Sequence, residues 1–409
     1  MNGISVNSRK GIATMKFLFR NLIIASIALV APPVLAQDDC VEFRDRCVKQ
    51  NRTSHFIDIS SASDDLAGIE QLSWLKAVTL RGKGEESAQV DISALSKLPE
   101  LVDISLDNVT ILTPTDLLDI NVSRLTINGG ATDLAVLEQL SGLERLNLYD
   151  VNAGKPVEFG GLANLQSLTM VNMPIANPSD LSNLSKLQSL VLANTGITDL
   201  SIIADLDLTR LVLRGDGLRD LSQLGKMQAL EFLTLNGSEF TSLDGLDLGE
   251  NLRMFSAENS ALQDISGLTN AVNVKDVSLK GSQITNLDGL ENLAQLETLD
   301  VRETPLNDIS GFGAHPKLEK LWLSDTKVED LSPLSGLGNL KEMSLSRMPA
   351  KDLSVLAELD KLGALWLNET KATDLTPLLD MDVLEGIAID GNTVFGKENL
   401  RNFVESFGK

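Results

Sequence analysis

The sequence predicts an α/β solenoid shaped as a horseshoe, with one short parallel β-strand in each repeat and 3-10 or short helical turns on the convex side. The main observation is a segment of the form L-x-x-L-x-L that recurs from Leu143 to Leu384 with a period of 22 residues, shortened once to 21. Weaker copies begin at Leu75, Leu101 and Val122. A repeat of this length is too small to bury its own apolar face and must stack on its neighbours.

Residues 1–36 are predicted to be a cleaved export signal. A basic stretch opens at Met15, a possible true start of the chain, and an apolar run follows at 22–30. Residues 34–36, Val-Leu-Ala, have the small-residue form of a signal-peptidase site before Gln37. The apolar run is too short to span a bilayer core of about 30 Å. We therefore expect an exported protein that begins at Gln37, with the periplasm and the extracellular medium both open as destinations.

The exported protein is expected to be strongly acidic. The 409-residue chain has a formal net charge of −22, and removal of residues 1–36 takes away four basic and no acidic side chains, which leaves −26. Nucleic acids and anionic lipid surfaces bind basic patches, so this charge argues against both as partners. No second long apolar run follows the signal, and we expect no membrane insertion.

Residues 37–60 are predicted to form an N-terminal cap, which contains the two cysteines of the chain, Cys40 and Cys47. An isolated pair in an exported protein favours a disulfide. In one continuous helix their Cα atoms would lie about 10 Å apart, beyond the reach of a disulfide, about 7 Å. Either the segment turns and the cysteines are bridged, which is our prediction, or the thiols stay free. A redox or metal role would require a C-x-x-C motif or further ligands, and the sequence has neither.

Residues 61–392 form the predicted solenoid, in which 187–208 are a typical unit. Leucines at its first, fourth and sixth positions alternate with more polar residues, which indicates a short strand with alternate side chains facing the core. Asp199 then precedes a Leu-Ser pair, where its carboxylate is expected to cap the exposed N–H groups of a helical turn. The same aspartate recurs before Leu or Ile and then Ser or Thr, at Asp220, Asp264, Asp308, Asp330, Asp352 and Asp374.

This combination of motifs resembles the bacterial internalin-type leucine-rich repeat, most clearly at 195–203, 326–334 and 370–378. The resemblance implies a leucine-rich-repeat horseshoe and, because the family comprises secreted or surface binding modules, partner binding. The family usually has Asn at the ninth position of the repeat. This chain has hydroxyl residues there, so we expect a hydroxyl ladder in place of the amide ladder. These residues are Thr195, Ser238, Ser260, Ser282, Thr304, Thr326 and Thr370.

Residues 393–409 are predicted to form a C-terminal capping helix. Leu400, Phe403 and Phe407 follow helical spacing beyond the last repeat. Such a helix would cover the apolar cross-section of the last repeat, which water would otherwise reach.

The concave face is predicted to be nearly neutral. In each repeat the third, fifth and seventh positions point away from the core. Eight of these positions are basic, namely Arg81, Arg124, Arg145, Arg210, Arg214, Lys280, Arg302 and Lys320. Seven are acidic, namely Asp103, Asp107, Glu258, Asp276, Asp300, Glu342 and Asp390. The excess negative charge must then lie elsewhere, which leaves this face available for contact. Short strands also tolerate few carboxylates in general, and this second explanation is equally open.

Trp322 and Trp366 are the candidate ligand anchors. They occupy the fifth position of two repeats, in a column that otherwise holds mostly Ser or Thr, and Ser344 lies between them. Two strand spacings place them about 10 Å apart, and large exposed aromatics are common interface anchors. In the alternative, the indoles lie flat against neighbouring side chains and only stiffen the sheet. The rest of the candidate patch comprises Asp300, Arg302, Lys320, Asn368 and Glu369.

The sequence gives little support for catalysis. Its two histidines, His55 and His315, are far apart and are expected to be loop residues without a chemical role. No hydrolase, metalloprotease, P-loop or dinucleotide motif is present, and we expect no cofactor or metal. We therefore predict a non-enzymatic recognition module that binds a protein or a glycan through its concave face. The alternative is a structural spacer or self-associating envelope protein with no specific ligand.

Overall fold

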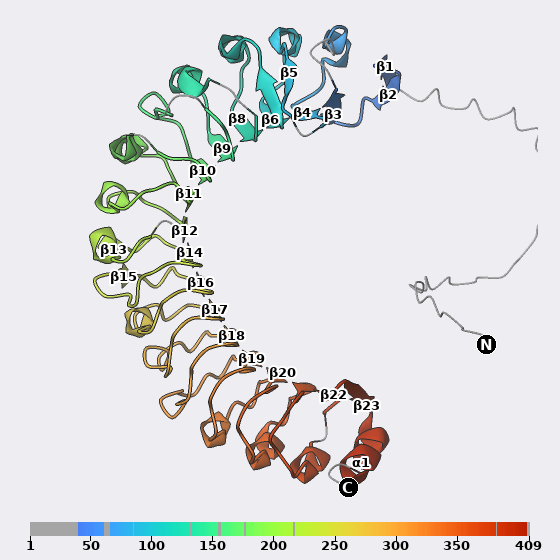
Figure 1. Ribbon diagram of the computed structural model, residues 1–409, viewed down its shortest axis with the longest axis vertical. Helices are drawn as coiled ribbons and strands as arrows, with labels where there is room; N and C mark the ends of the chain where they lie inside the picture. The colour runs from blue at the N-terminus through green and yellow to red at the C-terminus, as the bar shows by residue number, and fades with distance from the viewer. Residues whose placement is uncertain are drawn as a thin grey trace, which may run out of the picture.

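The chain folds into an open horseshoe with its main β-strands along the inner rim and its turns along the outer rim (Figure 1). The structure is a computed structural model and describes residues 40–60, 66–84, 86–130, 133–153, 157–175, 177–215, 217–381 and 383–406. The predicted export signal at 1–36 lies outside these ranges. The first and last described elements lie at opposite tips of the horseshoe, because each repeat stacks only on its neighbours (Figure 1).

A single curved sheet lines the concave face. Sixteen of the described strands run parallel in it, and equivalent positions of adjacent repeats face one another, as Leu299 faces Leu321. This register follows from the constant period, since every repeat places the same position at the same height. The strands are β3 (Ser54–Ile59), β4 (Ala77–Gly82), β6 (Asp103–Asp107), β8 (Arg124–Asn128), β9 (Arg145–Tyr149), β10 (Ser167–Val171), β11 (Ser189–Ala193), β12 (Arg210–Arg214), β14 (Phe232–Thr234), β16 (Met254–Ser256), β17 (Asp276–Ser278), β18 (Thr298–Asp300), β19 (Lys320–Trp322), β20 (Glu342–Ser344), β21 (Ala364–Trp366) and β22 (Gly386–Ile389).

The outer rim consists of short turns, and the recurrent aspartate caps those of the later repeats. Asp199 Oδ1 accepts the backbone N–H of Ser201 at 3.0 Å. The six equivalent aspartates accept the same bond at 2.8 to 2.9 Å, so the predicted caps are confirmed. The 3-10 turns are η1 (Ile69–Leu72), η2 (Ser93–Lys97), η3 (Pro114–Asp119), η4 (Leu134–Gln139), η5 (Pro178–Asn183), η6 (Ser201–Ile203), η7 (Ser222–Leu224), η8 (Ser266–Leu268), η9 (Ser332–Leu334), η10 (Ser354–Glu358) and η11 (Thr376–Asp380). Outside the main sheet, β5 (Ala88–Val90) pairs with β7 (Val109–Ile111) and β13 (Lys226–Met227) with β15 (Asp247–Leu248).

The repeat leucines form one continuous core between the sheet and the outer turns. Leu299, Leu321 and Leu365, at the fourth position of three repeats, are each at most 1% exposed. They belong to a single apolar cluster that runs from the N-terminal hairpin to the last helix. Burial of each leucine therefore depends on the repeats on either side, as a solenoid requires.

The ninth-position hydroxyls do not form the ladder that we expected. Four of them bond instead to the carbonyl three residues earlier in their own repeat. For example, Ser260 Oγ donates to Ala257 O, and Thr304 Oγ1 donates to Val301 O, both at 2.7 Å. A hydroxyl is shorter than an amide side chain, so it is satisfied locally and does not reach the next repeat, about 4.8 Å away.

An inter-repeat ladder occurs one residue earlier, at the eighth position. Asn194 Nδ2 donates to Asn172 Oδ1, and Asn172 Nδ2 donates to Asp150 Oδ1, both at 2.7 Å. All three residues have positive φ, between 53° and 56°. Asn and Asp adopt this left-handed conformation more readily than most residues. The turn that leaves each of these strands thus exposes an amide or carboxylate to the next repeat.

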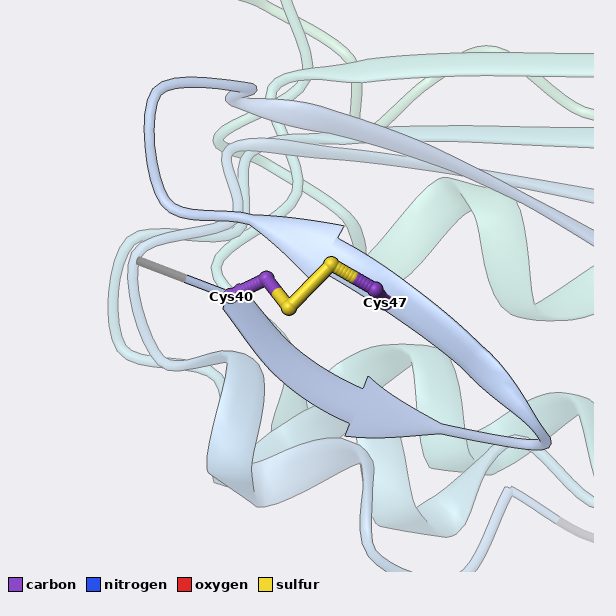
Figure 2. Close-up of a disulfide and its surroundings, with 2 residues drawn as sticks. All are labelled: Cys40 and Cys47. Carbon is purple, nitrogen blue, oxygen red and sulfur yellow. A yellow bond between two sulfur atoms is a disulfide. The ribbon is translucent and has the colours of Figure 1, made fainter. Parts of the chain in front are cut away.

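A disulfide-linked hairpin closes the N-terminal end (Figure 2). Strands β1 (Cys40–Phe43) and β2 (Arg46–Lys49) are antiparallel, and Cys40 and Cys47 are bridged with their Cα atoms 5.4 Å apart. The bridged turn that we predicted is confirmed, because the hairpin brings the two Cα atoms within disulfide range where a continuous helix would not.

The sheet begins before residue 61, the predicted start of the solenoid. Strand β3 already pairs in parallel with β4 and is the first strand of the sheet. Ile57 and Ile59 take the place of the usual leucines there and are buried. Phe43 and Val48 of the hairpin are buried against the same core. The hairpin therefore forms the cap, and the described part of the predicted 37–60 segment, residues 40–60, divides between cap and sheet.

The C-terminal end is closed by a strand and a helix. Strand β22 turns at Asp390 and Gly391, which both have positive φ, into the antiparallel strand β23 (Asn392–Phe395). A two-residue turn of this kind is a common hairpin connection, and it ends the run of parallel strands. Helix α1 (Lys397–Ser406) follows. The capping helix predicted at 393–409 therefore begins four residues later, because the Asp-Gly turn first reverses the chain.

Helix α1 covers the last repeat with Leu400 and Val404, which are both buried. Phe403 packs against the same core, and Phe407, the third predicted contact, lies outside the described residues. Over the part of the chain that the structure describes, no helix is both long and apolar enough to cross a membrane.

Candidate binding site on the concave face

Several charges on the concave face neutralise one another in pairs. Arg124 Nε lies 2.9 Å from Asp103 Oδ2, and Lys320 Nζ lies 3.1 Å from Glu342 Oε1. The partners occupy the third position of adjacent repeats, where the register sets them opposite each other. Exposed pairs of this kind contribute at most about 1 kcal/mol each. They reduce the unpaired charge on a face that the sequence already predicted to be nearly neutral.

Trp322 of β19 and Trp366 of β21 meet above the intervening strand β20. Their ring centroids are 5.3 Å apart with an interplanar angle of 53°, closer than the separation of about 10 Å that two strand spacings predict. The indoles lean together because Ser344, the residue between them in the register, is too small to hold them apart. Ser344 is only 8% exposed as a result. Both indoles remain partly exposed, so the pair is packed and accessible at once.

Arg302 extends the aromatic pair on its N-terminal side. Its guanidinium carbon lies 5.6 Å from the centre of the Trp322 ring, within cation–π range. Asp300 holds it there, because Asp300 Oδ1 accepts the Nε–H of Arg302 at 2.9 Å and its backbone N–H at 3.1 Å. The hydrogen bonds that Arg302 donates to this carboxylate raise the pKa of Arg302 above its ordinary value. The result is a contiguous cluster of one cation and two tilted indoles.

Hydrogen bonds between short polar side chains secure the strands beside this stack. Ser324 Oγ is hydrogen-bonded to Ser344 Oγ and accepts the backbone N–H of Ser346 at 3.1 Å. Ser346 Oγ in turn accepts the backbone N–H of Asn368 at 3.1 Å. These side chains link consecutive repeats, so the predicted patch residues Ser344 and Asn368 have a structural role in addition to any contact with a ligand.

Five of the eight predicted patch residues come together and three lie at the margin. Glu369 occupies a left-handed turn with φ of 54°, and its backbone N–H donates to Asp390 Oδ1 at 2.6 Å. Lys320 forms an ion pair with Glu342, and the backbone N–H of Asn368 donates to Ser346 Oγ. The residues that form one cluster are Asp300, Arg302, Trp322, Ser344 and Trp366.

A hollow of about 480 Å³ adjoins Trp366 on its C-terminal side. Small residues at outward positions of the last two repeats leave this space, namely Ala364, Gly386 and Ala388. Charged side chains also line it: Lys341, Lys361, Glu342 and Glu385. Large outward side chains, which mark the aromatic pair in the sequence, do not indicate this hollow. The available signal was a cluster of Gly and Ala at positions that elsewhere carry larger residues.

His315 lies in a loop, as expected, but is buried there, and His55 lies in a strand. His315 is 2% exposed, its ring centre lies 4.3 Å from that of Phe312, and its Nδ1 lies 3.2 Å from Leu293 O. Burial lowers the pKa of this imidazole. His55 lies in β3, edge-on to Phe43, and burial lowers its pKa as well. Among the described residues, no group of three or more His, Cys, Asp or Glu side chains is arranged to hold a metal ion.

Solved leucine-rich-repeat proteins share this architecture. The internalin InlF of Listeria monocytogenes matches with a TM-score of 0.53 and 22% identity over 85% of this chain and 90% of that chain. InlJ of the same species matches with a TM-score of 0.53 and 19% identity over 79% and 76% of the two chains. The fold is an internalin-type leucine-rich-repeat solenoid.

This solenoid architecture extends beyond bacterial proteins. A chain of the Drosophila Toll–Spatzle complex matches with a TM-score of 0.56 and 16% identity, over 82% of this chain and 55% of that chain. No family model matches the sequence, and no curated protein matches it. The likeness therefore rests on three-dimensional structure, which the leucine spacing preserves while most other positions vary.

Proposed function

We propose that this chain is an exported, non-enzymatic recognition module that binds a protein through the C-terminal half of its concave face. The observation that carries the proposal is the continuous surface formed by Arg302, Trp322 and Trp366 together with the adjoining hollow. Trp and Arg are the residues most enriched among interface hot spots. The hollow, with its floor of small residues, can receive a large apolar side chain of the partner.

The polar groups of the patch favour a protein over a glycan as ligand. Sugar hydroxyls require side-chain donors and acceptors that are free to bond. Among the patch residues, Asp300 is occupied by Arg302, Lys320 by Glu342, and Ser344 by Ser324. The same engagement argues against catalysis, because these groups serve the fold and none is paired as nucleophile and base.

The architecture supports a protein partner in a general way. A parallel sheet with a constant register presents an extended and largely preformed surface. A chain of similar architecture takes part in the Toll–Spatzle complex. The disulfide between Cys40 and Cys47 supports export, because such bonds persist in oxidising compartments.

The binding experiment compares three purified proteins. They are the parent, the double variant Trp322→Ala with Trp366→Ala, and a matched control, Tyr149→Ala with Phe232→Ala, which removes two aromatic side chains from the same face. Tagged parent protein captures partners from periplasmic and culture extracts, and a captured protein is purified for titration calorimetry. We expect the tryptophan variant to bind about 30-fold more weakly, the equivalent of about 2 kcal/mol.

The matched control should bind as the parent does. Equal affinity of the tryptophan variant and the parent would show that the indoles only stiffen the sheet. If the extracts yield a glycan instead of a protein, and the tryptophan variant binds it equally weakly, the proposed site would stand but its ligand would be a glycan.

Export is tested separately, by determining whether residues 1–36 are cleaved from the protein. N-terminal sequencing of the protein recovered from the periplasm or the medium should give Gln37 as the first residue. Thiol labelling of that material under denaturing conditions should find no free thiol at Cys40 or Cys47. Retention of residues 1–36, or two free thiols, would overturn this part of the proposal.

A further inference from the structure

The first strand of the sheet, β3, has a free edge. Among the described strands only β4 pairs with it, since β23 lies at the opposite tip of the horseshoe (Figure 1) and the hairpin forms a two-stranded sheet of its own. Ile59 O accepts the backbone N–H of Lys83 at 2.8 Å, so the odd-numbered residues of β3 bond towards β4. The backbone groups of the even-numbered residues Ser54, Phe56 and Asp58 therefore point away from the sheet, towards the hairpin.

Two adjoining hollows lie between the hairpin and this edge. One, of about 270 Å³, is lined by β2 and the start of β3, and the other, of about 210 Å³, by the hairpin turn and the rest of β3. Both include Arg46, His55 and Phe56, so together they form one channel along the strand, which we call the edge groove. Arg44 narrows its far end, where Nη1 donates to Asp58 O at 3.2 Å.

The edge groove is basic although the protein is acidic. A single carboxylate is found among its described lining residues, Asp58, which lies 3.1 Å from Lys83 Nζ and 3.8 Å from Arg46 Nη2. The cationic side chains of the lining are Arg44, Arg46, Lys49, Arg52 and Lys83. On a chain with a net charge of −22 this is a local reversal of sign, which attracts anionic groups and repels cationic ones.

We propose that the edge groove binds an extended acidic segment of a partner protein, which adds to β3 as a further strand. The main chain of the segment hydrogen-bonds to the outward groups of Ser54 and Phe56, and its carboxylates face Arg46 and Arg52. Strand addition of this kind draws affinity from main-chain hydrogen bonds and specificity from alternate side chains. Phe56, which is 58% exposed, provides an apolar contact for one side chain of the bound segment.

A second copy of this chain is not the occupant. Two such edges would bring the same cationic side chains together, and like charges on an edge strand oppose pairing. The wall of the groove is also preformed, because the disulfide fixes β2 against β1 and the Phe43 ring meets the His55 ring edge-on at 6.0 Å. A preformed groove reduces the ordering cost of binding.

The test uses a fluorescein-labelled hexapeptide in which Glu alternates with Val, with both ends blocked, and the full chain as receptor. Two further peptides serve as controls, one with Lys in place of Glu and one with alternate backbone amides N-methylated. Receptor variants are Arg46→Glu, Ser54→Pro, and the matched charge control Lys226→Glu, which alters an exposed lysine of the outer rim. Proline is tolerated at the first residue of an edge strand and removes the outward N–H of Ser54 without a change of charge.

We expect saturable binding of the acidic peptide by fluorescence anisotropy, weakened at least about tenfold by Arg46→Glu and by Ser54→Pro and unchanged by Lys226→Glu. The lysine and N-methylated peptides should each bind at least about tenfold more weakly than the acidic one. Melting curves are recorded for every variant, and the binding result of Ser54→Pro is used only if its melting temperature equals that of the parent. Absence of saturable binding up to about 1 mM, or equal binding of the N-methylated peptide, would overturn the proposal. The tryptophan double variant should bind this peptide normally, which separates the edge groove from the concave patch.

Discussion

At the scale of single residues, the indoles of Trp322 and Trp366 couple two repeats that are not adjacent in the stack. Their contact exists because a serine separates them, and a larger residue at Ser344 would hold them apart. Each indole therefore contributes to folding as well as to the proposed site. The two interpretations that the sequence left open, ligand anchor and packing element, are compatible in this geometry.

This contact predicts an energetic coupling. Unfolding in urea of Trp322→Ala, Trp366→Ala and the double variant should give a double-mutant cycle with a coupling of about 0.5 to 1.5 kcal/mol, the range for tilted aromatic pairs. A cycle between Trp322→Ala and Tyr149→Ala, on distant strands, should be additive within about 0.5 kcal/mol. Additive losses for the tryptophan pair would mean that the rings do not touch in solution.

The buried imidazole of His315 predicts a dependence of stability on pH. Burial lowers its folded-state pKa below the unfolded value of about 6.5, so the unfolded chain binds the proton more readily. The free energy of unfolding should therefore fall as the pH drops below about 6.5 and level off below the folded-state pKa. His315→Leu lacks this titration. Its unfolding free energy, measured from pH 7.5 to 5, should vary less than that of the parent, and parallel curves would contradict the prediction.

At the scale of elements, the recurrent aspartates cap seven of the outer turns. The hydroxyl and backbone N–H of Ser332 donate to Asp330 and lower the pKa of its carboxyl. Hydrogen bonds from the following Ser or Thr lower the pKa of five equivalent carboxyls in the same way, at Asp199, Asp220, Asp308, Asp352 and Asp374. The same interaction is thus repeated along the array.

Loss of one cap should destabilise its own turn. Asp330→Ala leaves the N–H of Ser332 without its acceptor and should lower the melting temperature, while Asp330→Asn retains an acceptor and should lower it less. The lowered pKa adds a contribution to stability that is present above about pH 4 and is lost as the pH falls through the folded-state value. The acid side of the stability curve should accordingly be shallower for Asp330→Asn than for the parent. Equal melting of the alanine and asparagine variants would argue against a capping role.

At the scale of the whole molecule, the solenoid is a one-dimensional array in which each interface is a nearest-neighbour interaction. The core is continuous, the contact between Trp322 and Trp366 reaches across one intervening repeat, and the ends are closed by elements of different kinds. The N-terminal hairpin combines a disulfide with the burial of Phe43 and Val48, whereas the C-terminal helix is held by apolar burial. Perturbations should therefore remain local and decay along the stack.

A cavity in one repeat tests this view. Leu323 is 1% exposed, and Leu323→Ala should cost about 2 to 5 kcal/mol of local stability. Hydrogen exchange should become faster for amides of β19 and its neighbours and change little near Leu125 in β8. Uniform acceleration over all repeats would show that the molecule unfolds as a single cooperative unit.

The repeat architecture, the strand register and the aspartate caps could all be predicted from the sequence. Each depends on spacing alone, because a constant period puts identical positions opposite one another, and because Asp199 and its equivalents bond to a residue only two positions away. The turn between Cys40 and Cys47 was predicted for a similar reason, since a disulfide limits the Cα separation. These constraints are local or periodic, so they can be inferred from the spacing of residues along the chain.

Other features were decided only by the tertiary structure, because they depend on how side chains of different repeats fill the space between them. The size of Ser344 determined that the indoles touch, and the length of a hydroxyl determined that Ser260 bonds within its own repeat. The hollow beside Trp366 exists because small residues line it where other repeats carry larger side chains. The edge groove exists because the hairpin packs beside β3. Spacing along the chain determines which positions of adjacent repeats lie side by side. The volume and length of the side chains at those positions determine which contacts form, and these contacts can be seen only in the stacked repeats.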